Sequence, residues 1–270
     1  MNAQVIQGLQ RWRTIRSTLS GSIGFVPTMG ALHEGHLALL KRSVSENDAT
    51  VLSIFVNATQ FNDRADLDRY PRSLEQDIAH AQRCGVDFIL LPDHAELYPD
   101  DYRYRVAEGE LSLALCGADR PGHFDGVLTV VMKLINLVRP STAYFGLKDY
   151  QQYRLIKGMC ESFFMETAIV GCETVREQDG LAMSSRNRRL DADARAKAGR
   201  LSGLLREART DEAAKAALTA ADMQVGYVQT LEGRRCAAVT LESCDGAVRL
   251  IDNVIVDSVD TSEMPGGESR

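Results

Sequence analysis

Two patterns of hydrophobic positions alternate along the chain up to about residue 175. Short runs rich in Val, Ile and Phe are followed by longer stretches in which apolar residues recur every three or four positions. The short runs predict strands at residues 23–26, 51–56, 86–91, 143–145 and 168–172, and the longer stretches predict helices at residues 36–45, 74–84, 126–138 and 150–163. This alternation is typical of an α/β fold with a parallel sheet and crossover helices.

The pattern changes after residue 175. Residues 191–221 are rich in Ala, Leu, Arg and Glu and predict helix, and three short strands follow at 225–231, 236–241 and 248–251. The turn pairs Glu232-Gly233 and Asp245-Gly246 separate these strands. We therefore expect two domains, residues 1–175 and a small α+β domain at 176–270, with a frayed polar tail at 259–270.

Composition narrows the class of protein. The 270 residues are 44% hydrophobic and 25% charged, which is ordinary for a globular protein. The apolar runs are too short to cross a bilayer, and the start of the chain has neither a basic leader nor an apolar signal core. The six cysteines form no C-x-x-C pair and are expected to be reduced core thiols. We therefore expect a cytoplasmic protein with no membrane segment.

The net charge of −6 bears on the partners. A nucleic-acid surface requires clustered Lys and Arg, so nucleic acid is not an expected partner. Anionic small molecules would have to be bound by a few local donors.

The segment 27–36 (PTMGALHEGH) directly follows the first predicted strand. Gly30 and Gly35 allow tight turns close to a ligand, and a strand-to-helix transition points free backbone N–H groups at an anion. His33 and His36 can donate to one phosphate chain. The alternatives are a loop with two incidental histidines, or a metal site at His33, Glu34 and His36, for which the sequence offers no further ligand cluster.

Two further segments carry cations. In residues 179–189 (DGLAMSSRNRR), the hydroxyls of Ser184 and Ser185 and the guanidinium of Arg186 suit a loop that closes over phosphate. The alternative is a solvated basic turn. In residues 144–152 (YFGLKDYQQ), Lys148 can contact phosphate, and Asp149 can either accept from ribose hydroxyls or only cap a helix.

A fourth segment, residues 55–62 (FVNATQFN), ends a predicted strand with neutral amides. Amide donors suit a hydroxy acid and are costly to bury without partners. The alternative is an Asn-rich turn without a binding role.

Together the four segments resemble the pantothenate synthetase (pantoate:β-alanine ligase) family over nearly the whole chain. In this resemblance, residues 33–36 (HEGH) are similar to the "HIGH" signature of the nucleotidyltransferase superfamily, which includes class I aminoacyl-tRNA synthetases. Residues 183–186 (MSSR) are similar to the second, mobile signature loop. Residues 70–72, 120–127 and 249–253 also resemble the family.

The resemblance implies a Rossmann-like nucleotidyltransferase domain that binds ATP and pantoate, followed by a small lid domain. It implies that His36, His33, Lys148 and Arg186 are catalytic and that Gln60 and Gln152 bind pantoate. The residues implied to contact ATP are Met29, Gly30, Ala31, Leu32, His33, Glu34, Gly35, His36, Gly146, Leu147, Lys148, Asp149, Val175, Met183, Ser184, Ser185 and Arg186. It further implies Mg²⁺ bound with ATP, no separate metal site, and a homodimer.

The expected reaction condenses (R)-pantoate with β-alanine through a pantoyl adenylate, releasing AMP and diphosphate. Three other functions are weighed against it: nucleotidyl transfer to a phosphate or alcohol, tRNA aminoacylation, and nucleotide binding without catalysis. The neutral amides of Gln60 and Gln152 disfavour a phosphorylated substrate, and the acidic balance disfavours RNA. One departure from the family pattern is Ala58, where the family has proline, which predicts a looser loop around Gln60.

Overall fold

The computed structural model describes residues 3–256, and its chain forms two compact units. Unit 1 comprises Met1–Glu177 and Ala182–Arg188, and unit 2 comprises Gln178–Leu181 and Arg189–Arg270. The predicted tail at 259–270 lies outside the described residues. Within residues 3–256, every helix is too short or too polar to span a bilayer.

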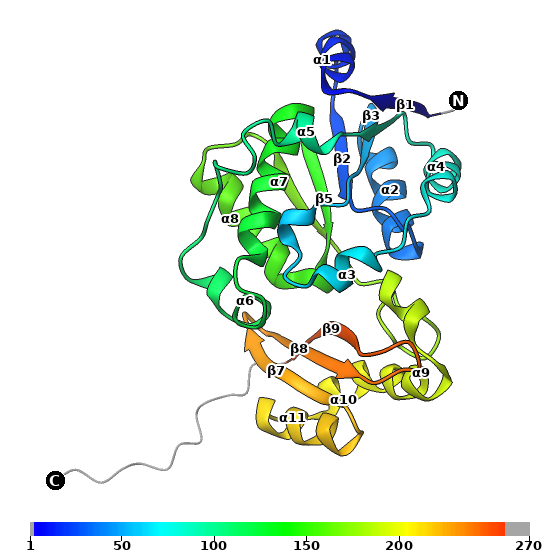
Figure 1. The fold of residues 1–270 in the computed structure, drawn as a ribbon, viewed down its shortest axis with the longest axis vertical. Helices are drawn as coiled ribbons and strands as arrows, with labels where there is room; N and C mark the ends of the chain where they lie inside the picture. Colours follow the sequence, from blue (N-terminus) through cyan, green and yellow to red (C-terminus); the bar gives the residue numbers. More distant parts are fainter. Residues whose placement is uncertain (1–2, 257–270) are drawn as a thin grey trace, which may run out of the picture. The chain divides into compact units, whose positions relative to one another are not determined.

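Unit 1 is built on a six-stranded sheet in which all neighbouring strands are parallel, so the predicted α/β class is confirmed (Figure 1). The strands are β1 (Gln4–Gln7), β2 (Ile23–Thr28), β3 (Ala49–Ile54), β4 (Phe88–Leu91), β5 (Thr142–Gly146) and β6 (Ala168–Cys172). Their order is β1-β4-β3-β2-β5-β6. From β2 the chain adds β3 and β4 toward one edge of the sheet and then β5 and β6 toward the other edge, so the switch point lies between the neighbouring strands β2 and β5. Such a switch point leaves a crevice at the carboxyl ends of the strands.

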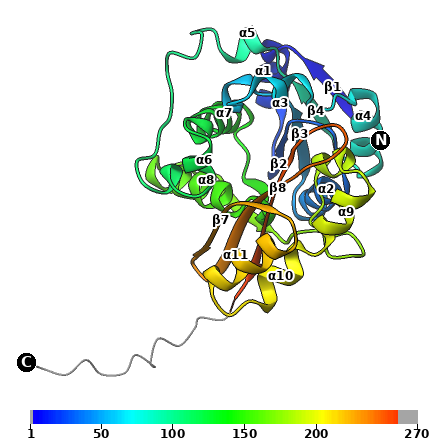
Figure 2. The ribbon, with the colours of Figure 1, turned by 60° about the horizontal axis from the view of Figure 1, so that its bottom comes forward.

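Helices cover both faces of this sheet (Figures 1 and 2). One face is covered by α2 (Glu34–Glu46) and α4 (Leu74–Arg83), and the other by α1 (Leu9–Thr18), α7 (His123–Val138) and α8 (Tyr150–Ser162). Short helical turns complete unit 1: η1 (Ala58–Gln60), α3 (Arg64–Asp68), α5 (His94–Leu97), η2 (Leu111–Leu113), α6 (Cys116–Asp119), η3 (Leu147–Asp149) and η4 (Ser185–Arg189).

The strands form because their β-branched and aromatic residues are buried from both faces. Val26, Leu52 and Ile89 from three adjacent strands are fully buried and pack against Leu37 and Leu40 of α2. Continuous apolar runs of this kind are typical of parallel strands covered on both sides. The core therefore holds β2 and β3 rigidly under the loops that follow them.

The sequence pattern does not predict β1 and α1. Strand β1 has only four residues, and α1 carries several charged or polar side chains, so neither has a clear apolar period. Tertiary contacts stabilise them instead: Trp12 is fully buried, and its Nε1 donates to the Leu137 carbonyl at 2.9 Å. A single large aromatic side chain thus anchors α1 against the end of α7.

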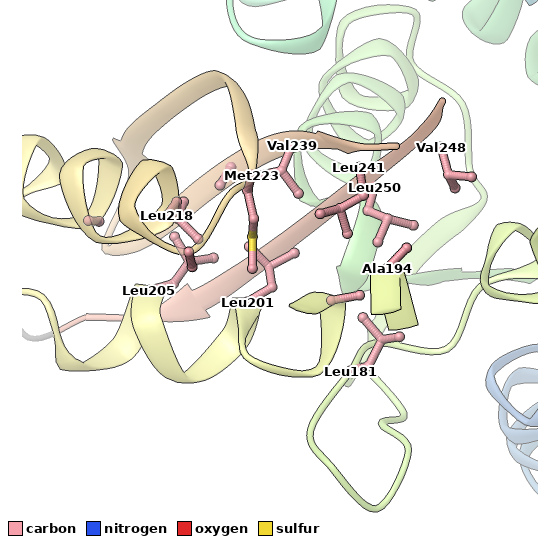
Figure 3. Packing of buried hydrophobic residues seen from close by; sticks show 14 of the residues in the cluster. Leu181, Ala194, Leu201, Leu205, Leu218, Met223, Val239, Leu241, Val248 and Leu250 are labelled. Carbon is pink, nitrogen blue, oxygen red and sulfur yellow. The ribbon is translucent and has the colours of Figure 1, made fainter. Parts of the chain in front are cut away.

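Unit 2 is an antiparallel three-stranded sheet packed against helices, as the sequence predicts for this region. The strands are β7 (Gln224–Leu231), β8 (Arg234–Leu241) and β9 (Val248–Ile255). The helical stretch predicted as one block at 191–221 is three helices, α9 (Ala192–Gly199), α10 (Leu201–Glu207) and α11 (Asp211–Ala220), because residues 200 and 208–210 turn the chain. Figure 3 shows the small apolar core between these helices and the sheet, with Leu201, Leu205, Leu218, Val239 and Leu250 among its members.

Four of the six cysteines are buried in the described structure, as expected of core thiols, and all six are free. Cys84 is half-buried, and Cys244 is exposed in the turn between β8 and β9, so the expectation of a core thiol is wrong for Cys244. A thiol in a polar turn has no apolar partners to bury it.

Candidate active site

A pocket opens in unit 1 where β2 and β5 end, at the switch point of the sheet. Its cavity volume is about 230 Å³. The predicted site residues that line it are Met29, His33, Gly35, His36, Gln60, Gly146, Lys148, Asp149, Gln152, Val175, Met183, Ser184, Ser185 and Arg186. Segments far apart in the sequence therefore meet at one place, which spacing alone could not show.

The two histidines of the pocket cap the start of α2, because the Nδ1 atom of each accepts a backbone N–H there. The Gly35 N–H donates to His33 Nδ1 at 3.2 Å, and the His33 N–H donates to His36 Nδ1 at 3.3 Å. Their ring centroids are 4.1 Å apart. Since both Nδ1 atoms accept, each neutral ring carries its proton on Nε2, which remains a donor.

Both rings are held in the neutral form. Burial, followed by the neighbouring Lys148 charge, lowers the pKa of His33 from 6.5 to about 4. Burial and the His33 ring, together with Lys148, lower the pKa of His36 to about 3. At pH 7 the site therefore presents two neutral imidazoles beside a lysine.

The loop between β2 and α2 is anchored by a buried carboxylate that no sequence motif indicates. Asp77 of α4 is 2% exposed and accepts the backbone N–H groups of Ala31 at 2.9 Å and Leu32 at 2.8 Å. Ala31 has φ of 51°, a left-handed conformation that is costly for alanine. The two hydrogen bonds to Asp77 offset that cost.

These contacts correct one expectation. The N–H groups of Gly30, Ala31, Leu32, His33 and Gly35 are not free for an anion, because each donates to a side chain of unit 1. These five N–H groups are therefore engaged within unit 1.

Five predicted nucleotide contacts do not line the pocket. Gly30 and Ala31 border a second cavity of about 520 Å³, on the side of Asp77. Leu32 and Leu147 are buried, and Glu34 is exposed in the first turn of α2. Their predicted contacts with ATP stay predictions.

Asp149 occupies the N-cap position of α8, but its side chain makes no capping hydrogen bond. It lines the pocket together with Lys148, directly after β5. The alternative in which Asp149 only caps the helix is therefore not what the structure shows.

The segment from Met183 to Arg186 is attached to unit 1. The Met183 N–H donates to the Val175 carbonyl at 2.9 Å, and Arg186 Nη2 lies 3.0 Å from Asp66 Oδ2 in an ion pair. The Arg186 side chain is 30% exposed. This segment forms part of the pocket wall, and the Arg186 guanidinium is paired with a carboxylate.

The turn that carries Gln60 is closed by two backbone hydrogen bonds, with Ala58 as its first residue. In η1 the Gln60 N–H donates to the Asn57 carbonyl at 3.3 Å, and the Phe61 N–H donates to the Ala58 carbonyl at 3.2 Å. Helix α7 approaches this turn closely at Gly126, where a Cβ would lie 2.6 Å from the Thr59 carbonyl oxygen. Gly126 thus permits the approach that places Gln60 in the pocket.

The apolar wall of the pocket was not predicted as part of a site. Val127, Val130, Val131 and Leu134 of α7 line it beside Gln60. The sequence shows only their helical spacing, which is equally typical of a buried helix, so the pattern holds no signal that one face borders a ligand. Three polar residues to which the family resemblance assigns no role also line the pocket: Asn57, Tyr70 and Glu173.

Among residues 3–256, no group of three or more His, Cys, Asp or Glu side chains is arranged to hold a metal ion. Asp149 and Glu173 are carboxylates of the pocket.

The parallel sheet, with imidazole and cationic side chains lining a pocket at its switch point, defines an α/β protein with a polar ligand pocket at the carboxyl ends of its strands. A model of the family described as pantoate-beta-alanine ligase matches residues 2–255. The pantothenate synthetase of Bdellovibrio bacteriovorus is 53% identical over 251 residues, 93% of this chain and 98% of that protein. The Coxiella burnetii pantothenate synthetase is 49% identical over 252 residues, covering 93% and 96%. The chain belongs to the pantoate-β-alanine ligase family and is an amide-forming ligase.

Two solved structures are similar over nearly their full lengths. A pantoate-beta-alanine ligase from Francisella tularensis, complexed with beta-gamma ATP and beta-alanine, has a TM-score of 0.87 and 39% identity, covering 94% of this chain and 97% of that one. The pantothenate synthetase of Thermus thermophilus has a TM-score of 0.85 and 39% identity, covering 93% and 99%.

Proposed function

We propose that this protein condenses (R)-pantoate with β-alanine, using ATP, through a pantoyl adenylate, and releases AMP and diphosphate. The observation that carries the proposal is the mixed lining of one pocket. His33, His36 and Lys148 supply donors to it, and Gln60 and the valines of α7 line the same pocket. Donors suit the phosphates of ATP, and an amide beside an apolar wall suits a hydroxy acid with two methyl groups.

The family supports the choice of substrates. The Francisella tularensis ligase was crystallised with beta-gamma ATP and beta-alanine, and the curated relatives are named pantothenate synthetases. We propose that this chain binds the same two ligands and pantoate.

In the first step, a carboxylate oxygen of pantoate attacks the α-phosphorus of ATP and diphosphate leaves. Negative charge grows on the phosphate oxygens, so fixed donors lower the barrier. We assign this role to the Nε2–H groups of His33 and His36, to Lys148, to Ser184 and Ser185, and to Arg186. The pKa of His36, lowered to about 3, favours donation of a hydrogen bond over transfer of a proton.

Arg186 must exchange partners to serve in this step. In the structure its guanidinium is paired with Asp66 at 3.0 Å. We propose that the phosphates of ATP compete with this carboxylate for the guanidinium, which can bind two phosphate oxygens at once.

Mg²⁺ commonly binds through nucleotide phosphates and one or two carboxylates. Asp149 and Glu173 supply oxygen donors in the pocket and would hold it together with ATP. When bound, the ion would neutralise phosphate charge.

In the second step, the neutral amine of β-alanine attacks the acyl carbon of the adenylate and AMP leaves. Free alkyl amines are mostly protonated at pH 7, so this step should accelerate as pH rises. The lid role of residues 176–270 and the homodimer stay predictions from the resemblance, and the cytoplasmic location stays a prediction from the composition of the sequence.

The test is product release from ATP and Mg²⁺ with pantoate, with and without β-alanine. We expect exchange of labelled pyrophosphate into ATP with pantoate alone, and steady AMP release only when β-alanine is also present. Exchange that did not depend on pantoate would exclude the proposed acid substrate.

A further inference from the structure

The amide of Gln60 is held in one orientation by a chain of buried hydrogen bonds. The chain starts at the Gly126 carbonyl of α7, which can only accept. Asn57 lies 3.1 Å from it and is 1% exposed. Because a carbonyl requires a donor, the Asn57 atom facing it is the amide nitrogen Nδ2.

The same nitrogen determines the orientation of Gln60. Asn57 Nδ2 also lies 3.1 Å from the Gln60 side-chain amide, so the Gln60 atom at this contact is the oxygen Oε1. Gln60 Nε2 is then directed away from Asn57, toward Met29 Sδ at 3.2 Å, where sulfur is only a weak acceptor. Both Gln60 and Met29 line the pocket. Gln60 therefore presents N–H donors to a ligand.

Two hydroxyl groups hold the other side of the Asn57 amide. The Tyr98 hydroxyl donates to Asn57 Oδ1 at 2.9 Å, and the Thr59 hydroxyl donates to the same oxygen at 2.9 Å. Tyr98 is 3% exposed, and its ring is packed against Phe55 and lies 4.7 Å from Lys133 Nζ. Burial raises the pKa of Tyr98 to about 12, so its hydroxyl keeps its proton.

We infer that Tyr98 is a positioning residue for the acid substrate: through Asn57 it keeps Gln60 as a donor-only contact, which selects a carboxylate or hydroxyl oxygen of pantoate. Tyr98 itself does not line the pocket. This inference rests on the proposed function, because it assumes that Gln60 contacts pantoate.

The test compares Tyr98→Phe with Tyr102→Phe in pantoate-dependent exchange of pyrophosphate into ATP. Tyr102 is the matched control, since its ring lies 5.7 Å from that of Tyr98, whereas the hydroxyls that donate to Asn57 Oδ1 are those of Tyr98 and Thr59. We expect Tyr98→Phe to raise the KM for pantoate about fivefold, the usual effect of losing one hydrogen bond, and to leave the KM for ATP unchanged. Tyr102→Phe should change neither constant.

The double variant Tyr98→Phe/Thr59→Val removes both donors to Asn57 Oδ1, and we expect it to raise the pantoate KM further than either single change. An unchanged pantoate KM in the double variant would overturn the inference. So would an equal rise in the KM for ATP, because it would indicate a general structural defect. If the unmodified protein shows no pantoate-dependent exchange, the proposed function fails instead, so the two failures are distinguishable.

Discussion

The proton positions on His33 and His36 decide what each ring can do in the pocket. Both Nδ1 atoms are occupied by backbone N–H groups at the start of α2, so only Nε2 can reach a ligand. Each side chain therefore caps the helix through Nδ1 and offers a hydrogen-bond donor through Nε2. Substitution of either ring therefore removes a helix cap as well as a donor.

Replacement of His36 by Ala should lower the rate of adenylate formation by a factor of about 100 to 1000, the usual loss when one donor to transition-state charge is removed. The measurement is pantoate-dependent pyrophosphate exchange at saturating ATP. His80→Ala is the control, because His80 lies on α4 outside the pocket. A folded His36→Ala protein with normal exchange would show that the His36 ring does not contribute to adenylate formation.

The pH dependence separates the two roles considered for His36. A hydrogen-bond donor with a pKa of about 3 is already neutral above pH 6, so exchange should vary less than about threefold between pH 7 and 9. Amide formation should rise over the same range, because more β-alanine becomes neutral. A roughly tenfold loss of exchange per pH unit above 7 would instead require a protonated histidine.

At the scale of elements, the site depends on close approaches between segments that are remote in sequence. Asp77 of α4 anchors the loop after β2, and Gly126 lets α7 contact η1. In the sequence, Asp77 is one of two acidic residues in the first turn of a polar helix, and Gly126 is an interruption in an apolar helix. Neither position carries a local signal of its role, because both act on a partner brought near by folding.

Gly126→Ala should displace η1, since the new Cβ would lie 2.6 Å from the Thr59 carbonyl oxygen and 2.8 Å from Gln60 Cα. We expect a rise of about tenfold or more in the KM for pantoate and a loss of about 1–3 kcal/mol of stability from overpacking. Gly158→Ala is the matched control: Gly158 lies in helix α8, and among residues 3–256 no atom beyond its neighbours and the backbone of its own helix would lie within 4 Å of an added Cβ. That variant should keep its activity and gain about 1 kcal/mol in stability.

At the scale of the whole molecule, folding of unit 1 buries three histidines in the neutral form. The pKa values of His33 and His123 are lowered to about 4 and that of His36 to about 3, with burial as the main cause in each. The unfolded chain takes up protons near pH 6.5, whereas the folded unit does not until about pH 4 or below. Stability is therefore highest above pH 6.5 and falls as the solution is acidified.

Between pH 6.5 and 5, unit 1 should lose about 1.5 kcal/mol for each of these histidines. Trp12, the single tryptophan of the chain, is fully buried in unit 1, so its fluorescence reports unfolding by denaturant. His123→Asn removes one titrating ring and should reduce the loss by about a third. Equal losses in both proteins would contradict the burial of a neutral His123.

The sequence by itself determined the strands and helices with strong apolar periods, and the motifs at the ends of β2, β3 and β5. These are local properties, because burial imposes its period on consecutive residues and a parallel sheet orders its strand ends at one edge. The short β1, the charged α1 and the breaks between α9, α10 and α11 have no such period, so local pattern could not place them.

Only the tertiary structure decided which side chains act together. The adjacent Gln151 and Gln152 show this most clearly. Gln151 is buried and its amide bonds the backbone of Leu111, Ala114 and Cys116, whereas Gln152 lines the pocket. Consecutive residues of a helix point about 100° apart, so neighbours in the sequence face different surroundings, and those surroundings come from distant parts of the chain.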